Sequence, residues 1–279
     1  MRARVVAWTV ACVALLAPAP AAADYVALGD SYSAGPLIPL QIAPFGCLKS
    51  SNNYAHLAAP KLGQPAFRDP SCSGAETEDM TQPQNVTPGP NPPQFNALNS
   101  QTKVVTLQMG GNDMGFSDIV KNCGVSWPWD AGCKGDYVHD GRDELSEKIA
   151  AIAAPLDRAL TEMKQRAPRA KRWLVSYPTV LPETGTGCYP AVPILPDDVV
   201  YLRAKVKELN AMLKTRAAAA GVGFIDIATP SIGHDFCSSS RWVEGLIPLS
   251  LAAPVHPNAA GMRGYTVTVA SHINAAVTS

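Results

Sequence analysis

Short apolar runs alternate with longer stretches of helical period along most of this chain. The apolar runs predict buried β-strands, and they lie at residues 25–28, 66–68, 103–109, 173–177 and 223–227. The segment 141–167 carries apolar residues on one face and charged residues on the other, as a helix that covers a sheet does. Asp197 and Asp198 can start another helix, which is expected to run to Ala220 and to end at Gly221. A last helix is expected after Pro257. This alternation predicts an α/β domain with a parallel sheet that is covered on both faces.

The first residues form a segment of a different kind. Two arginines precede an apolar run at 5–16, and three alanines end the segment at residue 23. This order is that of a secretory signal peptide, so we expect a signal at 1–23, one domain at 24–279 and a secreted protein. No later stretch reaches the roughly 20 apolar residues of a membrane helix, so no stable membrane insertion is expected.

Charge and motif content exclude several classes of partner. The chain has 23 basic and 23 acidic residues, and it becomes slightly acidic when the two arginines of the signal are removed. This balance gives no case for nucleic acid as a partner. Neither an H-E-x-x-H motif nor a phosphate-cradling glycine loop is present, so no metal and no cofactor are expected. No extended charged patch or long exposed amphipathic helix is evident, and we expect a monomer.

The cysteines indicate a disulfide framework. Outside the signal there are six of them: Cys47, Cys72, Cys123, Cys133, Cys188 and Cys237. An even number in an exported chain indicates disulfides rather than free thiols. The close cysteine or histidine pairs of a zinc site are missing. Closeness in the sequence favours a disulfide between Cys123 and Cys133 and another between Cys47 and Cys72. The remaining pair is then Cys188 with Cys237.

Polar residues follow two of the predicted strands. The first strand ends in Gly-Asp-Ser at 29–31, and a hydroxyl at the carboxyl end of a strand lies where open α/β sheets bind ligands. The alternative is that Ser31 only caps the next helix. The strand at 103–109 ends in Gly-Gly-Asn-Asp, which places Asn112 at the same edge. Gly74 lies among small residues, where backbone amides can face outward.

One histidine is a candidate base. A serine hydroxyl is a weak nucleophile at neutral pH, so acyl transfer requires a base beside it and donors for the oxyanion. Of the five histidines, His256 alone stands in a proline-bounded turn, directly before the last predicted helix.

Taken in order, Gly-Asp-Ser, Gly74, Gly-Gly-Asn-Asp and His-Pro-Asn resemble the GDSL or SGNH hydrolase family. The resemblance is greatest to its secreted actinobacterial lipase and esterase branch with three disulfides, and it covers essentially the whole mature chain. It implies a flavodoxin-like three-layer α/β/α sandwich with Ser31 as nucleophile and His256 as base. It also implies an oxyanion hole made by the Ser31 amide, the Gly74 amide and the Asn112 side chain. The segment around Ser31 lacks the Gly-x-Ser-x-Gly pattern that is typical of the α/β-hydrolase fold.

The chain departs from the family at one position. Most members have an Asp three residues before the histidine, but Ala253 stands here. The open alternatives are a carboxylate from elsewhere, a main-chain carbonyl, or an inactive relative. The candidate carboxylates are Asp226, Asp235 and Glu244. We expect the Ala253 carbonyl to orient His256, because a carbonyl selects the same Nδ1–H tautomer as an Asp. Some esterases and phospholipases of this branch are known to use such a Ser-His dyad.

The expected activity is that of a serine esterase or lipase that cleaves carboxylic esters. The apolar side chains at 36–45, together with Trp127 and Trp129, suit a fatty acyl chain. A phospholipase and a polysaccharide deacetylase are alternatives with the same chemistry. A non-catalytic binding protein is the alternative of another class, and the missing acid favours it.

Overall fold

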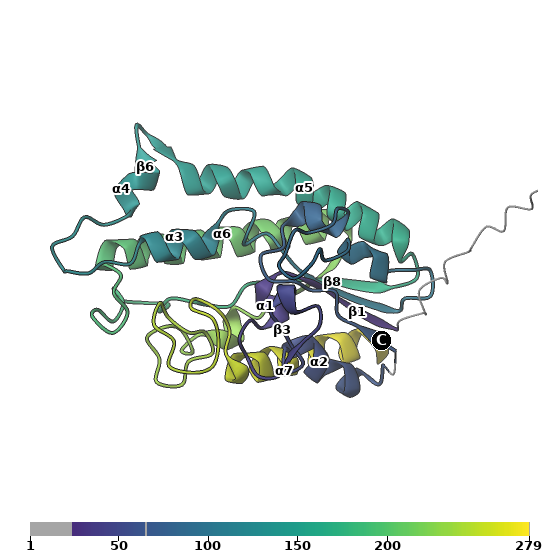
Figure 1. Ribbon diagram of the computed structural model, residues 1–279. Helices are drawn as coiled ribbons and strands as arrows, with labels where there is room; N and C mark the ends of the chain where they lie inside the picture. Colours follow the sequence, from purple (N-terminus) through teal and green to yellow (C-terminus); the bar gives the residue numbers. More distant parts are fainter. Residues whose placement is uncertain (1–23, 65, 279) are drawn as a thin grey trace, which may run out of the picture.

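The computed structural model describes residues 24–64 and 66–278, and the expected signal peptide at 1–23 lies outside this part of the chain. Its core is a parallel sheet of five strands (Figure 1), whose spatial order is β4 (Phe67–Arg68), β1 (Tyr25–Gly29), β5 (Val104–Gln108), β8 (Lys171–Val175) and β9 (Gly223–Ile225). Numbered along the chain, this is the 2-1-3-4-5 order of flavodoxin-like sheets. The order reverses between β1 and β5, so a ligand site is expected beyond their carboxyl ends.

Helices cover both faces of this sheet (Figure 1). The long helices α5 (Glu144–Arg166) and α6 (Pro196–Ala220) pack on one face, and α2 (Tyr54–Ala58) and α7 (Ala259–Thr278) on the other. Successive strand residues point to opposite faces. Along β1, Val26 and Leu28 therefore join the core with α5 and α6, whereas Tyr25 and Ala27 join the core with α2 and α7. The expected three-layer α/β/α sandwich is confirmed.

Shorter elements connect these layers. They are α1 (Ser31–Ala34), α3 (Phe116–Asn122), α4 (Lys134–Tyr137), the strand pairs β2 (Gln41–Ile42) with β3 (Lys49–Ser50) and β6 (Val138–His139) with β7 (Arg142–Asp143), and single 3₁₀ turns at Phe45–Cys47, Ala59–Leu62, Thr77–Met80, Gln94–Ala97 and Thr229–Ser231. Within the described residues, no helix has the length and apolar character needed to cross a bilayer.

Three disulfides link loops to the body of the domain. The three pairs are those expected from the sequence: Cys47–Cys72, Cys123–Cys133 and Cys188–Cys237. Cys47 and Cys72 are buried beside the carboxyl end of β1, because the Cys72 amide donates to the Gly29 carbonyl at 3.1 Å. This disulfide therefore fixes the loop that contains Gly74.

Candidate active site

Ser31 begins a short helix at the end of β1. The Asp30 carboxylate accepts a hydrogen bond from the Tyr32 amide at 2.8 Å, so Asp30 is the cap of α1 and Ser31 is its first residue. The alternative in which Ser31 is only a cap is wrong. A side chain at Gly29 would lie 2.7 Å from the Gln108 carbonyl oxygen, which explains the glycine before Asp30. The Ser31 hydroxyl is left free to face His256, with 2.8 Å between Oγ and Nε2.

The carbonyl that faces His256 belongs to Pro254 and not to Ala253. Nδ1 of His256 lies 2.7 Å from the Pro254 oxygen, whereas the Ala253 oxygen accepts the His256 main-chain amide at 3.3 Å. The expectation for Ala253 is therefore wrong. The reason is the turn: Val255 has a φ of 65°, and proline followed by a positive φ is typical of a type II turn. The flipped middle peptide of such a turn directs the Pro254 carbonyl away from the turn's own hydrogen bond.

This carbonyl assigns the tautomer of the imidazole. A carbonyl oxygen can only accept, so Nδ1 carries the proton and Nε2 presents its lone pair to the Ser31 hydroxyl, which donates. Burial and, to a smaller extent, the charge of Lys121 lower the pKa of His256 to about 4. The hydrogen bond to the Pro254 carbonyl raises the pKa but does not offset the effect of burial. The imidazole is thus neutral at pH 7 and can accept a proton.

Hydrogen bonds on both sides hold the histidine turn. The Tyr32 hydroxyl donates to the Val255 carbonyl at 2.6 Å, and the Val255 amide donates to the Gly245 carbonyl at 3.1 Å. The His256 carbonyl accepts from the Glu244 amide at 2.9 Å. A β-branched residue seldom adopts a positive φ, so Val255 keeps this conformation only because its surroundings impose it. The residue after the nucleophile therefore braces the turn that carries the base.

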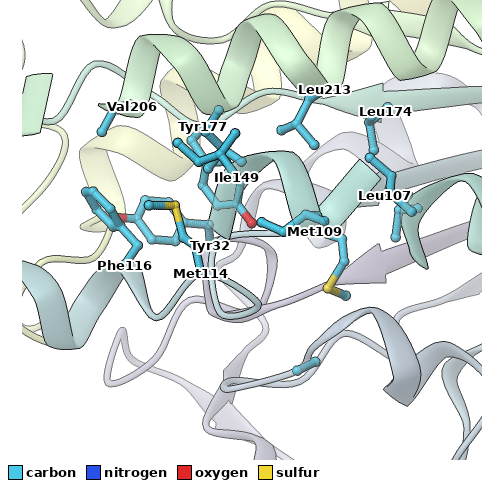
Figure 2. Close-up of a cluster of buried hydrophobic side chains, with 14 of the residues drawn as sticks. Tyr32, Leu107, Met109, Met114, Phe116, Ile149, Leu174, Tyr177, Val206 and Leu213 are labelled. Carbon is cyan, nitrogen blue, oxygen red and sulfur yellow. The ribbon is translucent and has the colours of Figure 1, made fainter. Parts of the chain in front are cut away.

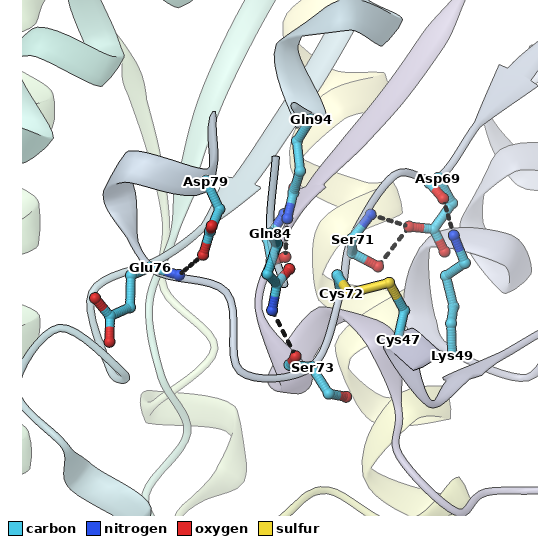
Figure 3. Close-up of a disulfide and its surroundings, with 11 residues drawn as sticks. Cys47, Lys49, Asp69, Ser71, Cys72, Ser73, Glu76, Asp79, Gln84 and Gln94 are labelled. Atoms are coloured by element: carbon cyan, nitrogen blue, oxygen red, sulfur yellow. Dashed lines mark hydrogen bonds between the residues drawn. A yellow bond between two sulfur atoms is a disulfide. The ribbon is translucent and has the colours of Figure 1, made fainter. Parts of the chain in front are cut away.

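The loop segments with Gly74 and Asn112 are bonded to each other. The Asn112 side-chain amide donates to the Ala75 carbonyl at 2.9 Å, and the Asp113 carboxylate accepts from the Thr77 hydroxyl at 2.6 Å. Figure 3 shows the Cys47–Cys72 disulfide next to Ser73, the residue before Gly74. Within the described chain, the main-chain amides of Ser31 and Gly74 have no acceptor. Asn112 keeps a second amide hydrogen that this bond to Ala75 does not use.

Tyr177, which the sequence reasoning missed, joins the two strand ends. Its hydroxyl accepts from the Gly111 amide at 2.7 Å and donates to the Asp30 carboxylate. The side chain of Asn210 on α6 bonds both the amide and the carbonyl of Tyr177, at 2.8 and 2.9 Å. Figure 2 shows Tyr177 and Tyr32 within the apolar cluster, and burial there raises the pKa of Asp30 to about 7. Tyr177 lies at the carboxyl end of the fourth predicted strand, at 173–177, a position that could have indicated its place at the site.

The three candidate carboxylates bond elsewhere. Asp226 accepts from the Ala228 amide at 2.8 Å, and Asp235 from the Cys237 amide at 2.9 Å. Glu244 is buried and accepts from Ser250, Leu249 and Asn258, which lowers its pKa despite burial. No hydrogen bond or ion pair joins any of the three carboxylates to His256, so the structure gives no support to a distant acid.

The apolar segment after α1 divides between core and surface. Ile38 is fully buried in the core with α2 and α7, whereas Leu40 and Phe45 are exposed. The expectation that Ile38 contacts substrate is therefore wrong, because core side chains already surround it. The described residues contain no group of three or more histidine, cysteine or carboxylate side chains placed to hold a metal ion.

Known proteins resemble this chain over most of its length. The model of the GDSL-like Lipase/Acylhydrolase family matches residues 27–263. Lipase 2 of Streptomyces coelicolor is 38% identical over 280 residues, which covers 93% of each chain. Two crystal structures each share a TM-score of 0.74 and cover 90% of this chain and 99% of their own: phospholipase A1 of Streptomyces albidoflavus, at 28% identity, and an extracellular lipase of Streptomyces rimosus, at 29%.

Proposed function

Because this chain belongs to the GDSL-like lipase/acylhydrolase family and is a carboxylic ester hydrolase, we propose that it acts through an acyl-enzyme on Ser31. The observation that carries the proposal is the 2.8 Å contact between Ser31 Oγ and Nε2 of an imidazole whose Nδ1 is held by a carbonyl. In the first step Nε2 takes the hydroxyl proton while Oγ attacks the ester carbonyl carbon.

The leaving alcohol then takes its proton from Nε2, and the acyl group remains on Ser31. A water molecule gives a proton to Nε2 and attacks the acyl carbon; Ser31 recovers its proton from Nε2 when the carboxylic acid leaves. Throughout, the Pro254 carbonyl accepts from Nδ1–H. It supplies orientation without the negative charge that an Asp would add to the imidazolium.

Three donors stabilise the oxyanion in this proposal: the amides of Ser31 and Gly74 and the side chain of Asn112. Support comes from the two amides without an acceptor and from the bond that ties Asn112 to the residue after Gly74. Loss of one such donor costs about 10² to 10³ in kcat. Asn112→Ala should therefore lower kcat by this factor.

The substrates proposed are fatty acyl esters, and no cofactor takes part. The names of the relatives support this class, since they include lipases and a phospholipase A1. We propose that the protein acts outside the cell, because disulfides such as its three form and persist in oxidising compartments. We also propose that it is a monomer with one domain at 24–279.

The test is hydrolysis of p-nitrophenyl esters from acetyl to palmitoyl by the mature chain. Ser31→Ala and His256→Ala should each lose activity on every ester, by at least about 10³-fold. Ser33→Ala is the matched control, because its hydroxyl lies on the same short helix and faces Gln108 at 3.2 Å. This control should retain activity.

Chain length distinguishes the alternatives. A rate that peaks at medium or long acyl chains supports the lipase assignment. Activity confined to the acetyl ester would indicate a deacetylase instead. Release of fatty acid from phosphatidylcholine but not from triacylglycerol would indicate a phospholipase. Equal activity of Ser31→Ala and the wild type would refute the acyl-enzyme.

A further inference from the structure

Three loops beside the Ser31–His256 pair expose large apolar side chains. We call six of them the apolar rim: Leu40, Phe45, Trp127, Trp129, Leu249 and Leu251. Each is more than half exposed, and Trp129, Leu249 and Leu251 exceed 70%. A single exposed apolar residue is ordinary, but a group of them around a site marks an interaction surface.

Close contacts bring the three loops together. The loop that follows α1 meets the histidine loop where the Ala253 amide donates to the Pro36 carbonyl at 3.1 Å. The tryptophan loop meets the histidine loop where a Cβ on Gly124 would lie 3.0 Å from Leu246 Cδ1. Figure 1 shows the loop between α3 and α4 and the loops before α7 at the same end of the molecule. The loops that carry the apolar rim therefore meet beside the segments that hold Ser31 and His256.

The tryptophan loop has a fixed shape. Trp127 and Trp129 stack with ring centroids 5.2 Å apart and planes 5° from parallel. The loop is closed by the Cys123–Cys133 disulfide, and its one carboxylate, Asp130, accepts the Ser126 and Trp127 amides at 2.9 Å. Two largely exposed indoles are thus held in place, and little conformational freedom remains to be lost on binding.

The charge of the loops limits the kind of partner. Residues 36–48 and 245–255 contain no charged side chain, and residues 124–132 contain only Asp130. An anionic membrane would be matched by lysine and arginine, which these loops lack. A protein or a second copy of this chain seated here would cover Ser31 and close the entrance that an ester must use. An uncharged surface that itself contains the ester substrate matches the lack of charged side chains in these loops and their place beside Ser31.

We propose that the apolar rim docks the enzyme on the surface of aggregated, electrically neutral lipid, so that ester molecules pass from that surface to Ser31. This inference rests on the proposed function and adds how its substrate is presented. Indole rings favour the boundary between water and hydrocarbon, and the leucine side chains bury apolar area in the same surface.

The binding test uses phosphatidylcholine vesicles and the mature chain with Ser31→Ala, so that the lipid is not consumed. Two double variants remove parts of the rim: Trp127→Ser with Trp129→Ser, and Leu249→Ser with Leu251→Ser. Each should weaken partition into the vesicles by about tenfold or more, because one lost apolar side chain corresponds to about tenfold in a binding constant. Val200→Ser with Val267→Ser is the matched control, since these exposed valines lie on α6 and α7, and it should bind like the parent.

A second readout separates docking from catalysis. With Ser31 intact, the ratio of activity on vesicles to activity on dissolved p-nitrophenyl acetate should fall in both rim variants and stay constant in the control. Hydrolysis of dissolved ester without binding to phosphatidylcholine would refute docking and leave the proposed function standing. Vesicle binding without ester hydrolysis would refute the proposed function alone. Binding that requires anionic lipid and is lost in salt would overturn the neutral surface inferred here.

Discussion

Replacement of Tyr177 by phenylalanine tests whether the two strand ends are positioned by one hydroxyl. Tyr177→Phe keeps the ring in its apolar cluster and removes the acceptor of the Gly111 amide and the donor to Asp30. An amide left buried without an acceptor costs about 1–3 kcal/mol, and a hydrogen bond to a charged group contributes about 1.5–3 kcal/mol. We expect the free energy of unfolding to fall by about 2–4 kcal/mol, because the two losses share one site and do not add fully.

The effect on catalysis follows from the position of Gly111, which directly precedes Asn112. Complete loss of an oxyanion donor costs about 10² to 10³ in kcat, and a displaced donor costs less. We therefore expect kcat to fall by about 10- to 100-fold. The Michaelis constant should change little, because Tyr177 is buried behind the site and acts on the transition state through Asn112.

Steady-state kinetics on p-nitrophenyl butyrate and thermal unfolding measure the two effects separately. Tyr265→Phe is the matched control, because the Tyr265 hydroxyl is buried and has no hydrogen-bond partner within the described residues. This variant should keep both kcat and the free energy of unfolding. A Tyr177→Phe enzyme that is less stable but has the kcat of the wild type would refute the positioning role and leave the tyrosine a structural one.

Three further predictions concern His256 and its surroundings. The value of kcat/KM on dissolved ester should stay high as pH falls and halve near pH 4, because the lowered pKa of His256 keeps the imidazole unprotonated above that value; a midpoint near pH 6.5 would contradict this. Tyr32→Phe removes the bond to the Val255 carbonyl and should lower kcat at least about fivefold at unchanged KM, checked against melting temperature. The carboxamide variants Asp226→Asn, Asp235→Asn and Glu244→Gln should each keep a kcat within about tenfold of the wild type. A loss of kcat as large as that of His256→Ala in any one of them would show that this residue completes a catalytic triad.

The regular elements follow closely from the pattern of apolar residues, and the deviations have local causes. The helix expected at 141–167 begins at Glu144, because the Asp143 carboxylate accepts the Leu145 and Ser146 amides and residues 138–143 form a small strand pair. The helices α3 and α4 were not predicted. They span seven and four residues, which is too short for an apolar period to appear.

At the site, side-chain positions were more predictable than main-chain directions. Ser31 and Asn112 were expected beyond the ends of β1 and β5 because parallel strands align their carboxyl ends. The carbonyl beside His256 was assigned to the wrong residue, because its direction depends on a positive φ at Val255 and valine gives no indication of one. Tyr177 was missed as a site residue because its bonds to Asp30 and Gly111 join residues far apart in the sequence.

The oxygen that faces Nδ1 of His256 is part of the peptide backbone, which changes how the site responds to mutation. A carboxylate in that place would disappear with one codon change, whereas every amino acid at position 254 brings a carbonyl. Mutational robustness at the position itself is therefore high, and vulnerability is moved to the residues that set the backbone path, such as Tyr32 and Val255. A search for inactivating substitutions around His256 should find them in the supports of the turn, some of them distant in sequence.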